Sequence, residues 1–232
     1  MKINGLEKMS LVDFDGFVSA TVFTGGCNFK CPFCHNSPLV LEHETLPLIP
    51  EGEVLSYLKK RQGLLDGVCI SGGEPTLQKD LPQFIEKVKA LGYKVKLDTN
   101  GTNPELVKSL YSAGLCDYFA MDIKNDKESY AKICGFDKFD TKKIEKSVEF
   151  FLGGNADYEF RTTVIKEFHD KENIKKIGKW LKGAKKYFLQ KFKDVGSCIE
   201  NDLSPIDDKI ALEFIEILKE DIPTVKLRGY DL

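Results

Sequence analysis

The stretch GGCNFKCPFCHN, residues 25–36, places three cysteines within eight positions: Cys27, Cys31 and Cys34. Thiolates are soft ligands that select zinc, copper(I) or iron–sulfur clusters. A structural zinc site normally takes four protein ligands, yet no second C-x2-C pair occurs in the sequence. The spacing C-x3-C-x2-C therefore favours a cluster with three cysteine ligands and one open iron. A zinc site remains the alternative on this evidence alone.

The histidines near this stretch are weak candidates for a fourth ligand. His35 follows Cys34 directly and would have to turn back sharply to reach the same metal, and His43 lies in a polar segment. The other cysteines occur singly, and we expect them to be inert residues rather than ligands: Cys69, Cys116, Cys134 and Cys198. Of these, Cys134 is the one to examine for proximity to the site.

Bulk composition excludes several classes of partner. The chain has 232 residues, 42% hydrophobic, with 34 basic and 36 acidic side chains. This balance predicts no surface for nucleic acid or for an anionic membrane. No apolar run approaches the roughly 18 residues of a membrane span, and the first residues lack the apolar core of a signal peptide. We expect a cytoplasmic protein without a disulfide framework.

Short β-rich runs alternate with amphipathic segments along the chain. The expected strands are 17–23, 66–75, 93–101, 117–124, 157–165, 185–192 and 223–229, and 17–23 is expected to be the first. The expected helices are 50–63, 81–92, 103–114, 141–154, 170–184 and 205–221. Such alternation predicts an α/β fold with parallel strands. Periodicity alone does not separate a partial (β/α)6 barrel from a doubly wound open sheet.

Chemically unusual residues recur where the expected strands end. They comprise the cysteine stretch, SGGE (71–74), DTNG (98–101), MDIK (121–124), Arg161 and, with weaker support, Gln190 and Phe192. Parallel α/β folds place their functional sites at the carboxyl edge of the sheet. We therefore expect these residues to converge on one site.

The cysteine spacing, with Phe33 before the last cysteine, resembles the signature of the radical S-adenosylmethionine (SAM) superfamily. The resemblance covers the chain from about residue 16 to its end. It implies a TIM-like partial (β/α)6 barrel as a single domain over 16–232, with a C-terminal helix and strand, after an N-terminal extension over 1–15. It also implies one 4Fe-4S cluster on Cys27, Cys31 and Cys34, and SAM bound at the open iron. In such enzymes the reduced cluster cleaves SAM to methionine and a 5′-deoxyadenosyl radical.

Further motifs resemble those that bind SAM in this superfamily. In the motif that SGGEPT resembles, the glycine backbone and the glutamate bind the methionine amino group of SAM. The resemblance therefore implies that Gly72, Gly73 and Glu74 bind this group. CHN, KLDTNGT and AMDIK resemble the glycyl-radical-enzyme activases. The resemblance implies that the cofactor site also contains Phe33, His35, Asp98, Thr99, Asn100, Asp122, Lys124 and Arg161. Asp98 and Asp122 would hold a monovalent cation, and Lys124 would face the SAM carboxylate.

The combination of these motifs is most similar to the activating proteins of anaerobic ribonucleoside-triphosphate reductase. It implies hydrogen abstraction from a glycine of that partner, with flavodoxin or ferredoxin as the reductant. The alternatives are another glycyl radical enzyme as substrate, or a small molecule such as a 7-deazaguanine precursor. The 7-carboxy-7-deazaguanine synthases usually read CDT where this sequence reads CHN. A zinc or electron-transfer module would leave SGGEPT, DTNG and MDIK without a role.

Overall fold

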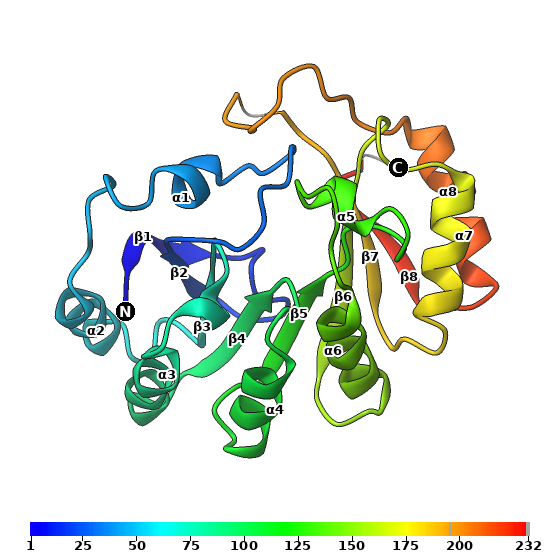
Figure 1. Cartoon of the computed structure of the whole chain (residues 1–232). Helices are drawn as coiled ribbons and strands as arrows, with labels where there is room; N and C mark the ends of the chain where they lie inside the picture. Colours follow the sequence, from blue (N-terminus) through cyan, green and yellow to red (C-terminus); the bar gives the residue numbers. More distant parts are fainter. Residues whose placement is uncertain (195, 231–232) are drawn as a thin grey trace. The chain divides into compact units, whose positions relative to one another are not determined.

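The computed structural model describes residues 1–194 and 196–230 (Figure 1). The chain divides into two compact units. Unit 1 contains Met1–Asn28 and Asn36–Ala120, and unit 2 contains Phe29–His35 and Met121–Leu232. The division falls inside the cysteine stretch, so that Cys27 belongs to unit 1 and the other two cysteines of the motif belong to unit 2.

Unit 1 is built on mostly parallel strands. They are β1 (Ile3–Ser10), β2 (Ser19–Thr24), β3 (Gly67–Gly72) and β4 (Lys94–Thr99), hydrogen-bonded in that order. The β1 strand runs antiparallel to β2, whereas β2, β3 and β4 are parallel. The next strand, β5 (Tyr118–Asp122), crosses the division between the units. The carboxyl ends of β2, β3 and β4 therefore meet at one edge of unit 1.

The three longer helices of unit 1 each bury one apolar face, whereas its short first helix has no buried residue. The helices are α1 (Ser37–Leu41), α2 (Glu51–Lys60), α3 (Leu81–Ala90) and α4 (Pro104–Ser112), with a 3-10 turn η1 at Pro75–Leu77. Figure 1 shows α3 and α4 on the same side of β3 and β4. In α3 the buried residues are Leu81, Phe84, Ile85 and Val88, the spacing of one helix face. Each such side chain contributes about 1.5–3 kcal/mol by leaving water.

Unit 2 repeats the strand-and-helix pattern. Its strands β6 (Tyr158–Val164), β7 (Tyr187–Lys191) and β8 (Val225–Arg228) are parallel neighbours. Its helices are α5 (Tyr130–Ile133), α6 (Lys142–Leu152), α7 (Lys171–Trp180) and α8 (Asp208–Lys219). The last two helices pack against each other, and α8 also contacts β8.

The structure confirms the expected α/β class with parallel strands, and this arrangement is consistent with the partial barrel of the radical SAM type. Every expected strand and every expected helix overlaps an observed one. The prediction that 17–23 is the first strand is wrong, because β1 precedes it. Its sequence INGLEKMS lacks a regular alternation, and only its first and last residues are buried, so periodicity gave no signal. The expected domain boundaries stay a prediction.

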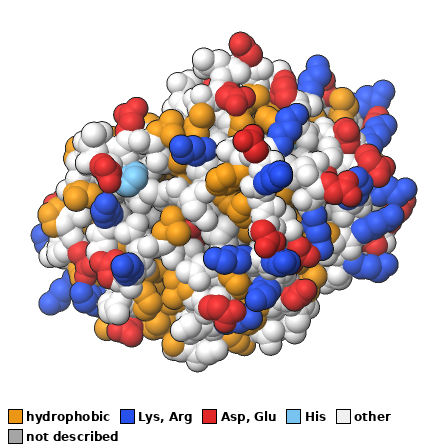
Figure 2. Space-filling view, viewed as in Figure 1, with side chains coloured by type: hydrophobic (Ala, Val, Ile, Leu, Met, Phe, Trp, Pro, Cys, Tyr) orange, Lys and Arg blue, Asp and Glu red, His pale blue; other side chains and the backbone are white. Residues whose placement is uncertain are grey.

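The hydropathy of the helices and the distribution of surface charge agree with the composition of the sequence. No helix among the described residues combines the length and the hydropathy needed to cross a membrane. On the face shown in Figure 2, acidic and basic side chains are interspersed, and they are dense over the side that carries α7 and α8. No large field of one sign is visible on that face, which fits the balanced charge of the sequence.

Two glycines at the end of β3 bring that strand against the segment before Cys27. The amides of Gly73 and Glu74 donate to the carbonyls of Thr24 and Gly26 at 2.9 and 2.8 Å. A Cβ at Gly73 would lie 2.1 Å from the Gly26 carbonyl oxygen. Gly72 has φ of 113°, and its Cβ would lie 2.4 Å from the Thr24 nitrogen. Only glycine permits this close approach of two backbones.

We expect Gly73→Ala to destabilise unit 1 by about 1–3 kcal/mol, because the added methyl overlaps backbone that cannot move independently. The control is Gly52→Ala, since a Cβ at Gly52 in α2 meets nothing within 4 Å. That substitution is expected to be neutral or to stabilise by about 0.5–1 kcal/mol. Urea unfolding of the two variants checks both values, and equal midpoints would contradict the close-packing argument.

Candidate active site

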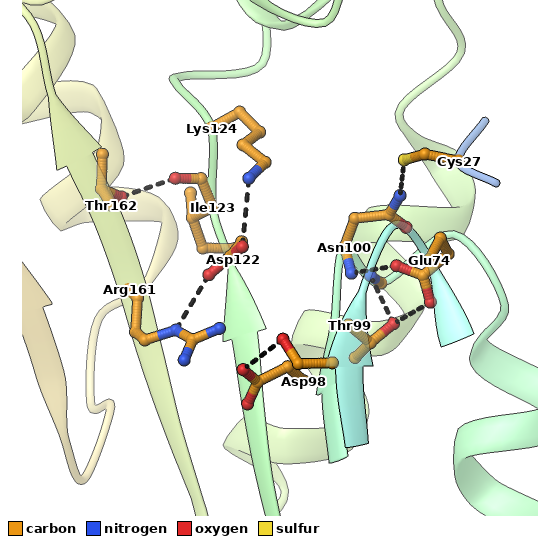
Figure 3. Close-up of polar contacts among 12 residues, drawn as sticks. Cys27, Glu74, Asp98, Thr99, Asn100, Asp122, Ile123, Lys124, Arg161 and Thr162 are labelled. Carbon is orange, nitrogen blue, oxygen red and sulfur yellow. Dashed lines mark hydrogen bonds and ion pairs between the residues drawn. The ribbon is translucent and has the colours of Figure 1, made fainter. Parts of the chain in front are cut away.

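The Glu74 carboxylate connects the ends of β3 and β4. It is 1% exposed and accepts hydrogen bonds from the Thr76 amide at 3.1 Å, the Thr99 hydroxyl at 2.8 Å and the Asn100 amide at 2.7 Å (Figure 3). The Thr76 hydroxyl donates a further bond. Burial raises the pKa of Glu74, and these donors oppose the shift. The Glu74 carboxylate thus holds the SGGE and DTNG motifs together. A contact between Glu74 and SAM stays a prediction.

Asn100 joins this group to the first cysteine. Its amide nitrogen lies 4.0 Å from the Cys27 sulfur and donates to the Asn28 side-chain oxygen at 2.8 Å. Its own oxygen accepts from the amide and the hydroxyl of Thr102, at 3.0 and 2.7 Å. These bonds fix which way the Asn100 amide points, with its N–H groups toward Cys27 and Asn28. Hydrogen bonds to a ligand sulfur are one means by which proteins tune a cluster.

Asp98 lies beside the same edge and faces a buried cation. The Ser71 hydroxyl donates to Asp98 at 3.0 Å, and the Lys96 ammonium lies 3.5 Å from its other oxygen. Lys96 is 3% exposed and also donates to the Asp13 carbonyl at 2.5 Å. Lys96 belongs to no motif that the sequence offers, although its place two residues before Asp98 on β4 puts both side chains on one face.

The segment Phe29–His35 is packed within unit 2 by aromatic contacts. Phe29 is 2% exposed and contacts Tyr130, Phe136 and Phe139, with ring centroids 6.4, 6.2 and 5.3 Å apart. The Cys34 amide donates to the Cys31 carbonyl at 3.0 Å, which closes a tight turn between these two cysteines. This turn places both thiols on one short loop anchored by a buried ring.

Cys134 lies beside Cys31, a relation that spacing in the sequence could not reveal. The Lys30 amide donates to the Cys134 carbonyl at 3.0 Å, and both cysteines are buried. A hydrogen bond with the Cys134 thiol lowers the pKa of Cys31. Burial opposes this shift, and the Lys124 cation adds to it. The surroundings of Cys31 thus favour a thiolate, the form that binds metal.

Asp122, Lys124 and Arg161 form a compact charged group (Figure 3). The Arg161 Nε donates to one Asp122 oxygen at 2.9 Å, and the Lys124 ammonium donates to the other at 3.1 Å. Lys124 lies past the end of β5, and Arg161 is the fourth residue of β6, so neither occupies the strand end that was expected. Two cations thus share one carboxylate, and the group carries a net positive charge.

The ion pairs control the protonation of this group. Burial raises the pKa of Asp122, but the Arg161 guanidinium and the Lys124 ammonium outweigh it and lower that pKa to about 2. Burial likewise disfavours the charged Lys124, but the negative charges of the Asp122 carboxylate and of the Cys31 thiolate raise its pKa well above the ordinary value. The group therefore keeps all three charges at neutral pH and can attract an anion.

Two rings of the cysteine segment also find partners in unit 2. The Lys124 ammonium lies 5.7 Å from the centroid of the Phe33 ring, within reach of a cation–π contact. The His35 ring stacks on Phe192 at 5.5 Å, and burial lowers the pKa of His35. The structure thus pairs Phe192 with a residue of the cysteine segment, and a role for Phe192 in the site stays a prediction.

The expected site residues fall into two groups, one in each unit. Unit 1 brings together Cys27, Gly72, Gly73, Glu74, Asp98, Thr99 and Asn100 at the ends of β3 and β4. Unit 2 brings together Cys31, Phe33, Cys34, His35, Asp122, Lys124 and Arg161 around the end of β5. Among the described residues, no three side chains of His, Cys, Asp or Glu already form a metal-binding group. The donor set nevertheless suits an iron–sulfur cluster, because it consists of thiols alone.

Known proteins resemble this chain in sequence and in fold. The family described as "Radical SAM superfamily" matches residues 21–181. A protein of Methanocaldococcus jannaschii named "Putative glycyl-radical enzyme activating enzyme" is 36% identical over 195 residues, which cover 82% of this chain and 79% of that protein.

Two solved structures share the fold at low sequence identity. A domain of a pyruvate-formate lyase-activating enzyme from Bacteroides vulgatus has a TM-score of 0.58 at 18% identity, covering 71% of this chain and 99% of that one. Streptococcus suis SuiB bound to S-adenosylmethionine has a TM-score of 0.69 at 17% identity, covering 89% of this chain and 49% of that one.

The pKa of Asp122 predicts a loss of stability in acid. A carboxyl whose pKa is lower in the folded state stabilises that state above its unfolded pKa, and this contribution is lost as the pH falls through the folded value. The shift from 3.8 to about 2 corresponds to roughly 2 kcal/mol, lost between about pH 4 and pH 2. Asp122→Asn should therefore unfold with a flatter pH dependence over that interval.

The control is Asp140→Asn, which removes an exposed ion pair with Lys142 at 3.8 Å. Such pairs contribute little, so this variant should keep the acid dependence of the parent protein. Urea unfolding at several pH values measures both variants. An Asp122→Asn profile parallel to that of the parent would show that the ion pairs do not shift this carboxyl.

Proposed function

Because this chain belongs to the radical SAM superfamily and to its glycyl-radical-enzyme activase type, we propose that it generates a glycyl radical in anaerobic ribonucleoside-triphosphate reductase. It is an enzyme of radical chemistry, and its family implies a 4Fe-4S cluster and SAM. When bound, the reduced cluster and SAM supply a 5′-deoxyadenosyl radical, which takes a hydrogen atom from the target glycine. The observation that carries the proposal is the charged group Asp122–Lys124–Arg161, which lies next to the cysteine turn of unit 2.

In this proposal Cys27, Cys31 and Cys34 hold three irons as thiolates. The lowered pKa of Cys31 favours the thiolate, the form that binds a metal. The Asn100 amide, 4.0 Å from the Cys27 sulfur, would stabilise the negative charge on that ligand. Because the motif offers three cysteines, one iron of the cluster would be left to bind SAM.

The charged group would orient SAM by its carboxylate. Asp122 already neutralises one of the two cations, so Lys124 and Arg161 together offer one net positive charge to an anion. Lys124 is 18% exposed at its side chain and carries donors that Asp122 does not use. In unit 1, the backbone of Gly72 and Gly73 would bind the SAM amino group. Glu74 would contribute by holding this turn in place through its hydrogen bonds.

The proposal also covers the remaining partners. Reduction would come from flavodoxin or ferredoxin in the cytoplasm, and none of the described cysteines is joined in a disulfide. A monovalent cation near Asp98 and Asp122 would join the cations that each carboxylate already faces, Lys96 for the first and Arg161 for the second. Dependence of SAM cleavage on added potassium or sodium tests that part separately.

The direct test is electron paramagnetic resonance of the reduced, reconstituted protein mixed with SAM and the reductase from the same source. We expect a glycyl-type doublet that requires all three components. Cys31→Ala should abolish it, whereas Cys198→Ala, outside the motif, should keep it. Formation of 5′-deoxyadenosine without the doublet would contradict this choice of partner and turn attention to other glycyl radical enzymes and to small molecules.

Lys124→Met should weaken SAM binding by about tenfold to a hundredfold, the value of a hydrogen bond to a charged group. The substitution keeps much of the length and the apolar stem of the side chain. The matched control is Lys127→Met, because Lys127 is exposed and pairs with Glu145 instead. Equilibrium binding to the reconstituted proteins measures both, and an unchanged affinity in Lys124→Met would remove Lys124 from the SAM site.

A further inference from the structure

The backbone that carries Lys124 continues past the end of β5 and is held there by side chains. The Ile123 amide donates to the Arg161 carbonyl at 2.8 Å, the last contact of this segment with the backbone of β6. The Thr162 hydroxyl then donates to the Ile123 carbonyl at 2.6 Å (Figure 3). The Lys124 amide donates to the Tyr130 hydroxyl at 3.3 Å. The placement of Lys124 therefore depends on which side chains meet this short segment.

His169 supplies the bond to the Lys124 carbonyl. Its Nε2 lies 2.9 Å from that oxygen, and its Nδ1 lies 3.1 Å from the Ile165 amide nitrogen. A carbonyl oxygen only accepts hydrogen bonds, so Nε2 carries the proton and donates it. Nδ1 is then free to accept from the Ile165 N–H. One neutral imidazole thus connects the segment after β5 to the segment between β6 and α7.

The surroundings of His169 make this connection rigid. The ring is 3% exposed, and burial lowers its pKa, which keeps it neutral. His169 precedes the first turn of α7, where Asp170 and Asn173 bond to each other reciprocally at 2.8 and 3.2 Å. A second bond runs in parallel, because the Asn125 amide donates to the Phe168 carbonyl at 2.8 Å.

We propose that His169 is a positioning residue for SAM, which acts by holding the Lys124 backbone through its Nε2–H. This inference rests on the proposed function, since it takes Lys124 as the contact to the SAM carboxylate. Without this bond, the segment after Asp122 could rotate about its backbone, and the Lys124 ammonium would lose its fixed place beside Asp122. No motif in the sequence singles out His169, because neither its burial nor its partners can be read from the pattern.

Two substitutions of His169 distinguish the hydrogen bond made by Nε2 from the one made by Nδ1. A Gln side chain places its amide nitrogen about as far from the backbone as Nε2, so His169→Gln can keep the donor to Lys124. An Asn side chain reaches only the position of Nδ1, so His169→Asn keeps a polar atom for Ile165 and loses the bond to Lys124. A cavity of about 310 Å³, lined by Asn125, Phe168 and His169 among others, borders this position. Water from that side can fill the space that the imidazole leaves in His169→Asn, which favours folding of that variant.

The first readout is amide hydrogen exchange of the metal-free protein over residues 122–126. We expect about tenfold faster exchange there in His169→Asn and less than about threefold in His169→Gln, with β7 unchanged in both. A merely structural role would speed exchange in β7 as well, through global unfolding. Exchange as slow in His169→Asn as in the parent protein would overturn the proposal.

The second readout is SAM affinity of the reconstituted proteins. We expect about tenfold weaker binding in His169→Asn and less than about threefold weaker binding in His169→Gln. Equal affinities in His169→Asn and the parent, or equal losses in both variants, would overturn the positioning role. If the parent protein itself binds no SAM, the proposed function fails, while the exchange experiment still tests the connection to Lys124.

Discussion

The contact between two backbones at Gly26 and Gly73 is the constraint on which the unit 1 side of the site depends. Gly26 precedes Cys27, and its carbonyl accepts from the Glu74 amide at 2.8 Å, with no room for a side chain at Gly73. The same turn presents the Glu74 carboxylate to the Thr99 hydroxyl and the Asn100 amide. One close approach thus sets the positions of the first cysteine and of two motifs that lie far apart in the sequence.

In unit 2 the corresponding role falls to an electrostatic arrangement. Asp122 shares its two oxygens between Lys124 and Arg161, and this sharing lowers its own pKa while it raises that of Lys124. Charges brought together in a partly buried site must be paired and hydrogen-bonded to be tolerated. Here the pairing leaves one positive charge in excess, which suits an anionic ligand. The segment after β5 that carries Lys124 depends for its shape on hydrogen bonds with Thr162, Tyr130 and His169.

The sequence predicted most of the strands and helices, and it singled out residues that the structure brings together within each unit. Strand and helix positions follow from periodicity, and the cysteine spacing and the glycine motif point to their chemistry without any knowledge of contacts. What escaped prediction depends on tertiary neighbours. The β1 strand has no regular alternation, and Lys96 and His169 are ordinary residues in the sequence whose roles come from the groups that fold against them. Likewise, the expectation that Lys124 lies within a strand was wrong because β5 ends at Asp122.

The central claim is that three cysteines hold a cluster whose remaining iron binds SAM. Mössbauer spectroscopy of protein reconstituted with iron-57, recorded with and without SAM, tests it most directly. We expect a 4Fe-4S spectrum in which SAM changes the signal of one iron and leaves the others unchanged. A spectrum that does not respond to SAM, or a protein that takes up zinc and assembles no cluster, would contradict it.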